Sequence, residues 1–174
     1  MGEQAYVLAD AGKPDLALAL VREAQQVESH RLPRRLAAWL AAAEAELSAL
    51  AGRADDCRRV LERAAAALPP GDEVTDREMP SIFLNHSHLA RWRGNVLALL
   101  GEADAVSELY AALTSMDPTF VRAQAGLRCD LAHAHLARGE FGDAQDHLGQ
   151  ARLLASRTGS VRHRRRIERL TQSL

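Results

Sequence analysis

The chain has 174 residues and a formal net charge of −1; 47 % of its residues are hydrophobic and only 4 % are aromatic. This length suits one domain with a sizeable core, the apolar fraction excludes bulk disorder, and the near-neutral charge excludes a protein that binds nucleic acid over its whole surface. Because Ala and Leu supply most of the apolar residues, the composition favours helices over strands and predicts an all-α fold.

Four glycine-centred turns organise the chain. Each turn glycine closes an apolar helical stretch and is followed within four residues by an aspartate; these glycines are Gly12, Gly52, Gly101 and Gly139. A glycine just after a helix readily adopts the left-handed conformation that reverses the chain. The aspartate then lies in the first turn of the next helix, where the helix dipole favours negative charge. Each signature therefore predicts a hinge between two helices.

In chain order, the hinges predict four helix pairs within a single domain that spans residues 1–174. The pairs cover residues 1–30, 34–69, 82–118 and 121–157, and a C-terminal cap covers residues 160–174. The stretch 69–79 is polar and rich in turn residues, so we expect an exposed connection there that divides the array into two lobes. In the cap, apolar residues at helical spacing form one stripe that would cover the last pair.

These features resemble tetratricopeptide repeats. The fourth pair matches best, through small and apolar residues on both sides of its hinge: Ala132, Gly139, Phe141, Ala144, Leu148 and Ala151. In the third pair, Gly94 is the small residue that lets the two helices approach closely. The hinge spacings of 40, 49 and 38 residues exceed the ~34 of a regular repeat. The resemblance implies a tetratricopeptide-like α-solenoid of about four helix pairs with a C-terminal capping helix.

A second resemblance covers roughly the last half of the chain. The runs at residues 88–101, 117–132 and 159–170 resemble the helical-repeat sensor region of Xre-type helix-turn-helix regulators from G+C-rich bacteria. In that family an N-terminal module reads DNA, and the repeat region senses a ligand or partner and mediates self-association. Here the first helix pair starts near Met1, so we expect the sensor and oligomerisation part without its DNA-binding half. A truncated chain, a free-standing paralogue and a split gene product all fit this expectation.

In tetratricopeptide arrays the first helix of each pair lines a concave face that binds ligands. The resemblance implies that residues at the corresponding positions of this chain line the same face. Seven of them are candidate ligand-binding residues: Trp39, Glu46, His88, Arg91, Asn95, Cys129 and His133. Arg91 and Asn95 lie one helical turn apart. An arginine can clamp a carboxylate, and an asparagine can bind both the N–H and the C=O of an extended peptide. We therefore expect a protein or peptide ligand; the alternative is a solvated polar face or ion pairs within the chain.

The sequence contains no motif for a cofactor, a metal or catalysis. His86 and His88, and likewise His133 and His135, are two residues apart. That spacing directs side chains to roughly opposite sides of a helix, whereas zinc sites on helices use a spacing of about three or four. Nucleotide-binding loops, nucleophile elbows and paired carboxylates in an apolar setting are absent from the sequence. We expect a non-catalytic protein with neither metal nor cofactor.

An arginine-rich run near the C-terminus forms a basic patch of Arg162, Arg164, Arg165, Arg166 and Arg169. No aromatic residue interleaves these arginines, so the patch predicts nucleic-acid binding that is weak or indirect. It also suits an acidic surface, including that of a second copy in a homodimer.

Two cellular expectations complete the prediction. No apolar run reaches the ~18 residues that span a bilayer, the first residues lack the basic and apolar regions of a signal peptide, and the two cysteines form no disulfide framework. We therefore expect a cytoplasmic protein. The favoured function is a protein- or peptide-binding module that is the sensor part of a bacterial transcription regulator; the alternative is a general interaction scaffold not linked to transcription.

Overall fold

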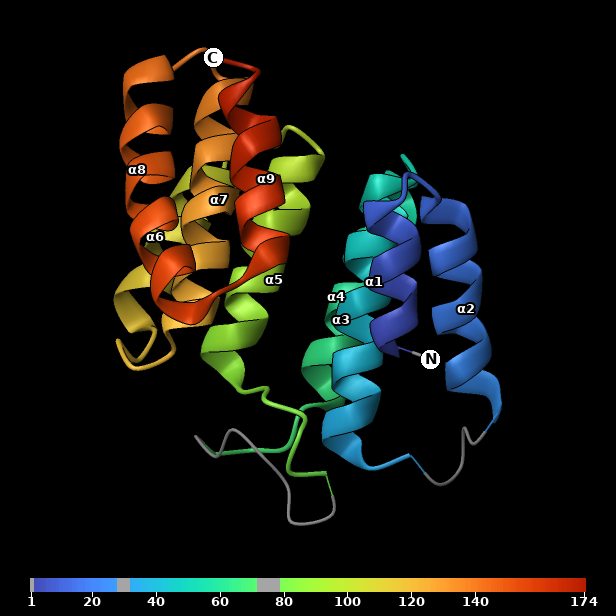
Figure 1. Cartoon of the computed structure of the whole chain (residues 1–174). Helices are drawn as coiled ribbons and strands as arrows, with labels where there is room; N and C mark the ends of the chain where they lie inside the picture. Colours follow the sequence, from blue (N-terminus) through green and yellow to red (C-terminus); the bar gives the residue numbers. More distant parts are fainter. Residues whose placement is uncertain (1, 28–31, 72–78) are drawn as a thin grey trace. The chain divides into compact units, whose positions relative to one another are not determined.

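The computed structural model describes residues 2–27, 32–71 and 79–174, and all regular structure in these ranges is helical (Figure 1). The helices are α1 (Gly2–Asp10), α2 (Pro14–Val27), α3 (Arg34–Leu50), α4 (Ala54–Ala67), α5 (His86–Leu99), α6 (Ala105–Ser115), α7 (Val121–Ala137), α8 (Phe141–Thr158) and α9 (Val161–Thr171). The all-α prediction is confirmed. Part of the predicted connection at 69–79 and the predicted end of the first pair at 30 lie outside the described residues. No helix in these ranges is both long and apolar enough to cross a membrane.

The glycine hinges have the conformation that the sequence predicts. Gly12, Gly52, Gly101 and Gly139 have φ angles of 75°, 73°, 70° and 73°, all left-handed. At the last of them, the Gly139 N–H donates to the Leu136 carbonyl at 3.0 Å and the Glu140 N–H donates to the His135 carbonyl at 2.9 Å. This pair of hydrogen bonds is a Schellman motif, which satisfies carbonyls at the end of the helix.

The same two bonds recur at the other predicted hinges and at a fifth turn. There, Gly159 has a φ angle of 62°, and the Ser160 N–H donates to the Ala155 carbonyl at 3.2 Å. The Ser160 side chain then accepts from the His163 N–H, which caps the start of α9. Every hinge is therefore closed by main-chain bonds around one left-handed glycine.

The chain divides into two compact units, Met1–Trp92 and Arg93–Leu174. The division falls within α5, rather than in the polar connection to which the sequence points. The unit Met1–Trp92 is called unit 1 below, and the unit Arg93–Leu174 is called unit 2.

In unit 1, α2 packs against both α1 and α3, and α3 packs against α4. The centre of this unit is an apolar cluster that consists of Ala5, Ala17, Leu18, Val21, Leu40 and Leu47. Most of the residues of α3 are buried, because alanines cover several sides of this helix and let its neighbours approach closely. Between these closely packed helices, Glu44 of α3 lies close to polar groups of α2 and α4.

In unit 2, α7 packs against α6, α8 and α9 (Figure 1). The core where α7, α8 and α9 meet consists of Cys129, Ala132, Leu148, Ala151, Ala155 and Ile167, with Leu170 packed against it. Between α5 and α6, a Cβ atom built on Gly94 would lie 2.6 Å from Leu109 Cδ2. The close approach of α5 and α6 that Gly94 predicts is therefore confirmed.

Candidate functional site

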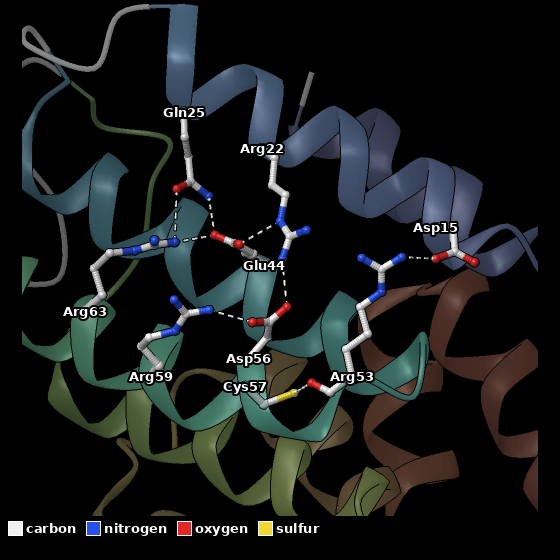
Figure 2. A network of polar contacts seen from close by, with 9 residues as sticks. All are labelled: Asp15, Arg22, Gln25, Glu44, Arg53, Asp56, Cys57, Arg59 and Arg63. Carbon is white, nitrogen blue, oxygen red and sulfur yellow. Dashed lines mark hydrogen bonds and ion pairs between the residues drawn. The ribbon is translucent and has the colours of Figure 1, made fainter.

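Three helices of unit 1 bring polar side chains together around an open hollow of about 640 Å³. Figure 2 shows this network, in which α2 and α4 reach toward a carboxylate on α3. The residues that line the hollow are Arg22, Gln25, Gln26, Glu44, Asp56, Arg59 and Arg63. Three arginines face two carboxylates, so the lining carries a net positive charge.

Glu44 lies at the centre of the network and is only 5 % exposed. Its Oε1 accepts from Arg22 Nε at 2.9 Å, and its Oε2 accepts from Gln25 Nε2 at 3.0 Å and also from Arg63 Nη2. Burial alone would raise the pKa of this carboxyl group, but the hydrogen bonds from Arg22 and Gln25 and the charge of Arg63 outweigh burial and lower the pKa. Glu44 is therefore an ionised, fully bonded anchor for both arginines.

Asp56 holds the outer part of the same network. Its Oδ1 accepts from Arg59 Nη2 at 2.5 Å, and its Oδ2 accepts from Arg22 Nη2 at 3.2 Å. The two arginines lower the pKa of Asp56, with the hydrogen bond from Arg59 as the larger cause. The side chains of Arg59 and Arg63 remain 76 % and 54 % exposed. Both guanidinium groups are thus oriented by carboxylates and still reach solvent.

The sequence prediction missed this network. Its members come from three helices, and no single run of sequence brings them together. A partial signal exists on α4, because Asp56, Arg59 and Arg63 are spaced by three and four residues and so share one helix face. Nothing in the sequence indicates that this face meets Glu44 of α3.

Two of the predicted ligand-binding residues, Trp39 and Glu46, lie together in unit 1. Glu46 Oε2 accepts from Tyr6 Oη and from Trp92 Nε1, each at 2.8 Å. The ring of Trp39 makes edge-on contacts with Tyr6 and Trp92, with ring centroids 6.2 Å apart in each pair. A Cβ atom built on Gly2 would also collide with the Trp39 ring. This cluster joins α1, α3 and α5, so its contacts serve the packing of the unit.

The three predicted residues of α5 have different environments. His88 Nδ1 lies 2.7 Å from Asn85 Oδ1, and burial, aided by the charge of Arg91, lowers the pKa of His88. Arg91 is half-buried. Asn95 is only 2 % exposed. The prediction of an open pair formed by Arg91 and Asn95 is therefore wrong for Asn95, whose amide is withdrawn from solvent.

Cys129 does not line an open face either. It is fully buried in the core of unit 2, between apolar side chains of α8 and α9. The prediction placed it on the ligand-binding face of the first helix of a pair, but α9 packs over that part of α7. Its neighbour His133 is half-buried, and burial, aided by the charge of Arg166, lowers its pKa.

Four of the five arginines in the predicted basic patch are exposed, and the fifth is bound within the unit. Arg162, Arg164, Arg165 and Arg169 are exposed on α9. Arg166 instead donates to Asp130 Oδ1 at 2.5 Å, and Asp130 is fully buried on α7. Arg166 therefore fastens α9 to α7, and its inclusion in a free basic surface is wrong.

One group of side chains has the composition of a metal site. Possible ligand atoms of His135, Glu140 and Asp143 lie within 4.8 Å of one another, across the hinge between α7 and α8. However, His135 Nδ1 already lies 2.7 Å from Glu140 Oε2, and Arg138 Nε donates to Glu140 Oε1 at 2.8 Å. These bonds satisfy the Glu140 carboxylate without a metal ion. We therefore interpret the group as contacts that stabilise the hinge between α7 and α8.

The comparisons with known proteins add no assignment: no family model, no curated protein and no solved structure matches this chain.

Proposed function

We propose that the chain is a non-catalytic binding module whose unit 1 binds an acidic segment of a protein or peptide in the hollow between α2 and α4. The observation that carries this proposal is the orientation of Arg59 and Arg63. Each guanidinium donates to a carboxylate of the network, and each side chain is still more than half exposed. Such an arginine has donors left over for an incoming carboxylate.

The network supports recognition because it removes much of the cost of ordering the arginines. A free arginine side chain loses about 2 kcal/mol of rotamer entropy when it is fixed. In unit 1 the carboxylates of Glu44 and Asp56 already restrict Arg22, Arg59 and Arg63. The net positive charge of the lining favours a negatively charged ligand, and the open hollow suits a chain segment on the protein surface.

The wider role that we propose is the sensor and oligomerisation part of a bacterial transcription regulator, acting in the cytoplasm. It rests on the two resemblances described above. Two of the helix contacts suit a tetratricopeptide-like array, because α2 packs against α3 and α6 packs against α7, in each case the first helix of the following pair. Self-association is tested by size-exclusion chromatography with light scattering; a strictly monomeric chain at high concentration would contradict the oligomerisation role.

The ligand proposal is tested with labelled hexaglutamate, hexaglutamine and hexalysine peptides in a fluorescence-polarisation titration at low salt. We expect hexaglutamate alone to bind. Added salt should weaken this binding, because exposed charges are screened. Arg59→Gln and Arg63→Gln should each weaken it about tenfold, since each removes a charge-assisted hydrogen bond.

Arg58→Gln is the matched control, because Arg58 is an exposed arginine of the same helix that does not line the hollow. It should reduce binding far less than Arg63→Gln. Equal losses in the two variants would assign the binding to general charge and contradict the hollow. No saturable binding of hexaglutamate at low salt would also contradict the proposal.

A further inference from the structure

A second polar cluster lies in unit 2, where α6, α7 and α8 each contribute one side chain. Tyr110 Oη lies 2.9 Å from His147 Nε2, and Arg128 Nη1 lies 3.1 Å from His147 Nδ1. The ring of His147 is buried, Arg128 is half-buried, and Tyr110 is 41 % exposed. The cluster therefore runs from the interior of the unit to its surface.

The partners of His147 determine which ring nitrogen carries the proton. A guanidinium can only donate hydrogen bonds, so Nδ1 of His147 must accept the bond from Arg128. The proton of the neutral ring is then on Nε2, which donates to Tyr110 Oη. As a result, the hydroxyl hydrogen of Tyr110 is not used by His147 and remains available to another acceptor.

His147 stays neutral in this arrangement. Burial, the charge of Arg128 and the neighbouring His135 lower the pKa of His147 to about 4. The His135 ring stacks on His147 with ring centroids 5.4 Å apart and is itself held by Glu140 through Nδ1. Neither of the two stacked rings carries a negative charge that could pair with the guanidinium of Arg128.

Arg128 is thus a partly buried cation that has no carboxylate partner among the residues that the structure describes. Its one hydrogen bond in the same residues goes to His147, and it uses one of the five donors of the guanidinium. Burial lowers its pKa, which reflects the cost of the unpaired charge. A half-buried arginine is normally paired with an anion, because an unpaired charge away from water is unfavourable.

We propose that Arg128 and Tyr110 form an oxyanion site in unit 2, distinct from the hollow in unit 1. Arg128 supplies a fork of N–H donors, and the Tyr110 hydroxyl, which is bonded to the other ring nitrogen of His147, supplies one more donor. A carboxylate or a phosphate group of a ligand fits this donor set. Two exposed acids on α8, Asp143 and Asp146, also act on the His147 ring, so they moderate the affinity for an anion.

The site is tested by titrating the 15N-labelled protein at neutral pH with inorganic phosphate and, separately, with acetate, at constant ionic strength. We expect saturable shifts of the His147 ring nitrogens, because Arg128 donates directly to this ring. Arg128→Gln should abolish the shifts, and Tyr110→Phe should weaken binding about fivefold. Asp146→Asn should tighten it. Tighter binding of phosphate than of acetate would identify a phosphate-bearing ligand; the reverse order would identify a carboxylate.

Arg152→Gln is the matched control, since Arg152 is an exposed arginine of α8 outside the cluster. Saturation that persists in Arg128→Gln, or that is lost equally in Arg152→Gln, would overturn the proposal, as would the absence of a saturable shift in the unaltered protein. If Arg128→Gln does not fold, Arg128→Lys replaces it in the test, because lysine keeps the positive charge but lacks the planar guanidinium donors. Weakened anion binding in Arg128→Lys would then support the site, and unchanged binding would contradict it. Arg63→Gln should leave these shifts intact, which separates this test from that of the hollow in unit 1.

Discussion

Glu44 shows how much one buried carboxylate can organise at the residue scale. It joins α3 to α2 through Arg22 and Gln25, and to α4 through Arg63. We expect Glu44→Gln to lower the free energy of unfolding of unit 1 by about 1–3 kcal/mol at pH 7, because two arginines lose their charged acceptor. Chemical denaturation measures this, with the exposed Glu62→Gln as a control that stays within about 0.5 kcal/mol.

The pH dependence of that difference follows from the lowered pKa of Glu44. A carboxyl group with a lowered pKa in the folded state stabilises the fold above its unfolded pKa, and this contribution is lost as the pH falls through the folded pKa. The difference in the free energy of unfolding between the unaltered protein and Glu44→Gln should therefore be constant from pH 6 to pH 8 and shrink toward zero below about pH 4. A gap that stays unchanged at low pH would contradict the role of the ionised carboxylate.

His147 also lowers the stability as the pH falls, but it does so already under mildly acidic conditions. The pKa of His147 is lowered from 6.5 to about 4 in the folded protein. Between these two values His147 is therefore protonated in the unfolded chain and neutral in the folded protein. This one residue should reduce stability by about 2 kcal/mol between pH 7.5 and pH 5. His147→Gln should flatten the pH profile, and the exposed His86→Gln serves as control. A His147 ring that titrates near pH 6.5 by NMR would contradict this prediction.

At the scale of the elements, glycines with different surroundings should respond in opposite ways to alanine. A Cβ atom on Gly94 would lie 2.6 Å from a side-chain atom of Leu109 and 3.3 Å from its backbone nitrogen, so α5 and α6 would have to separate. We expect Gly94→Ala to destabilise unit 2 by about 1–3 kcal/mol.

Gly149 is the matched control for this substitution. It lies on the exposed side of α8, and a Cβ atom built on it would meet open space, so Gly149→Ala should stabilise the helix by about 0.5–1 kcal/mol. Both values come from thermal or urea unfolding monitored by circular dichroism. A neutral Gly94→Ala would mean that α5 and α6 are not in close contact.

The attachment of α9 is a second prediction at this scale. Arg166 is a salt-bridge partner of the fully buried Asp130, and Ile167 inserts into the core of α7 and α8. Arg166→Gln should weaken this attachment by about 1–3 kcal/mol, so the amides of α9 should exchange with deuterium faster than in the unaltered protein. The neighbouring Arg165→Gln removes an equal charge on the exposed side and should leave the exchange unchanged.

The elements were predictable from sequence to the extent that local chemistry determines them. The left-handed glycines and the aspartates that follow them specify the hinges through contacts within a few residues, and the structure confirms these turns. The candidate site was not predictable in this way. Arg22 and Asp56 are 34 residues apart in sequence, and Cys129 is buried because α9 covers one side of α7. Both facts depend on which helix faces meet, and no local pattern encodes that.

At the scale of the whole molecule, we expect two unfolding transitions. Unit 1 and unit 2 each have an apolar cluster of their own. Both tryptophans of the chain, Trp39 and Trp92, belong to unit 1, so fluorescence reports on unit 1, whereas circular dichroism reports on all helices. The two probes should give different urea midpoints.

Core substitutions assign these transitions. Leu18→Ala, in unit 1, should shift the midpoint measured by fluorescence. Leu148→Ala, in unit 2, should leave the fluorescence midpoint unchanged and shift only the transition of unit 2, which circular dichroism detects. Each should cost about 2–5 kcal/mol. Coincident curves that move together in both variants would show that the chain unfolds as one cooperative body.

The five Schellman turns also bear on how such a chain could change in length. Each reversal needs one achiral residue and two main-chain bonds, so it makes no demand on the side chains of the helices that it joins. Duplicating or deleting the DNA that encodes the segment between two of these turns would therefore leave every remaining Schellman turn intact.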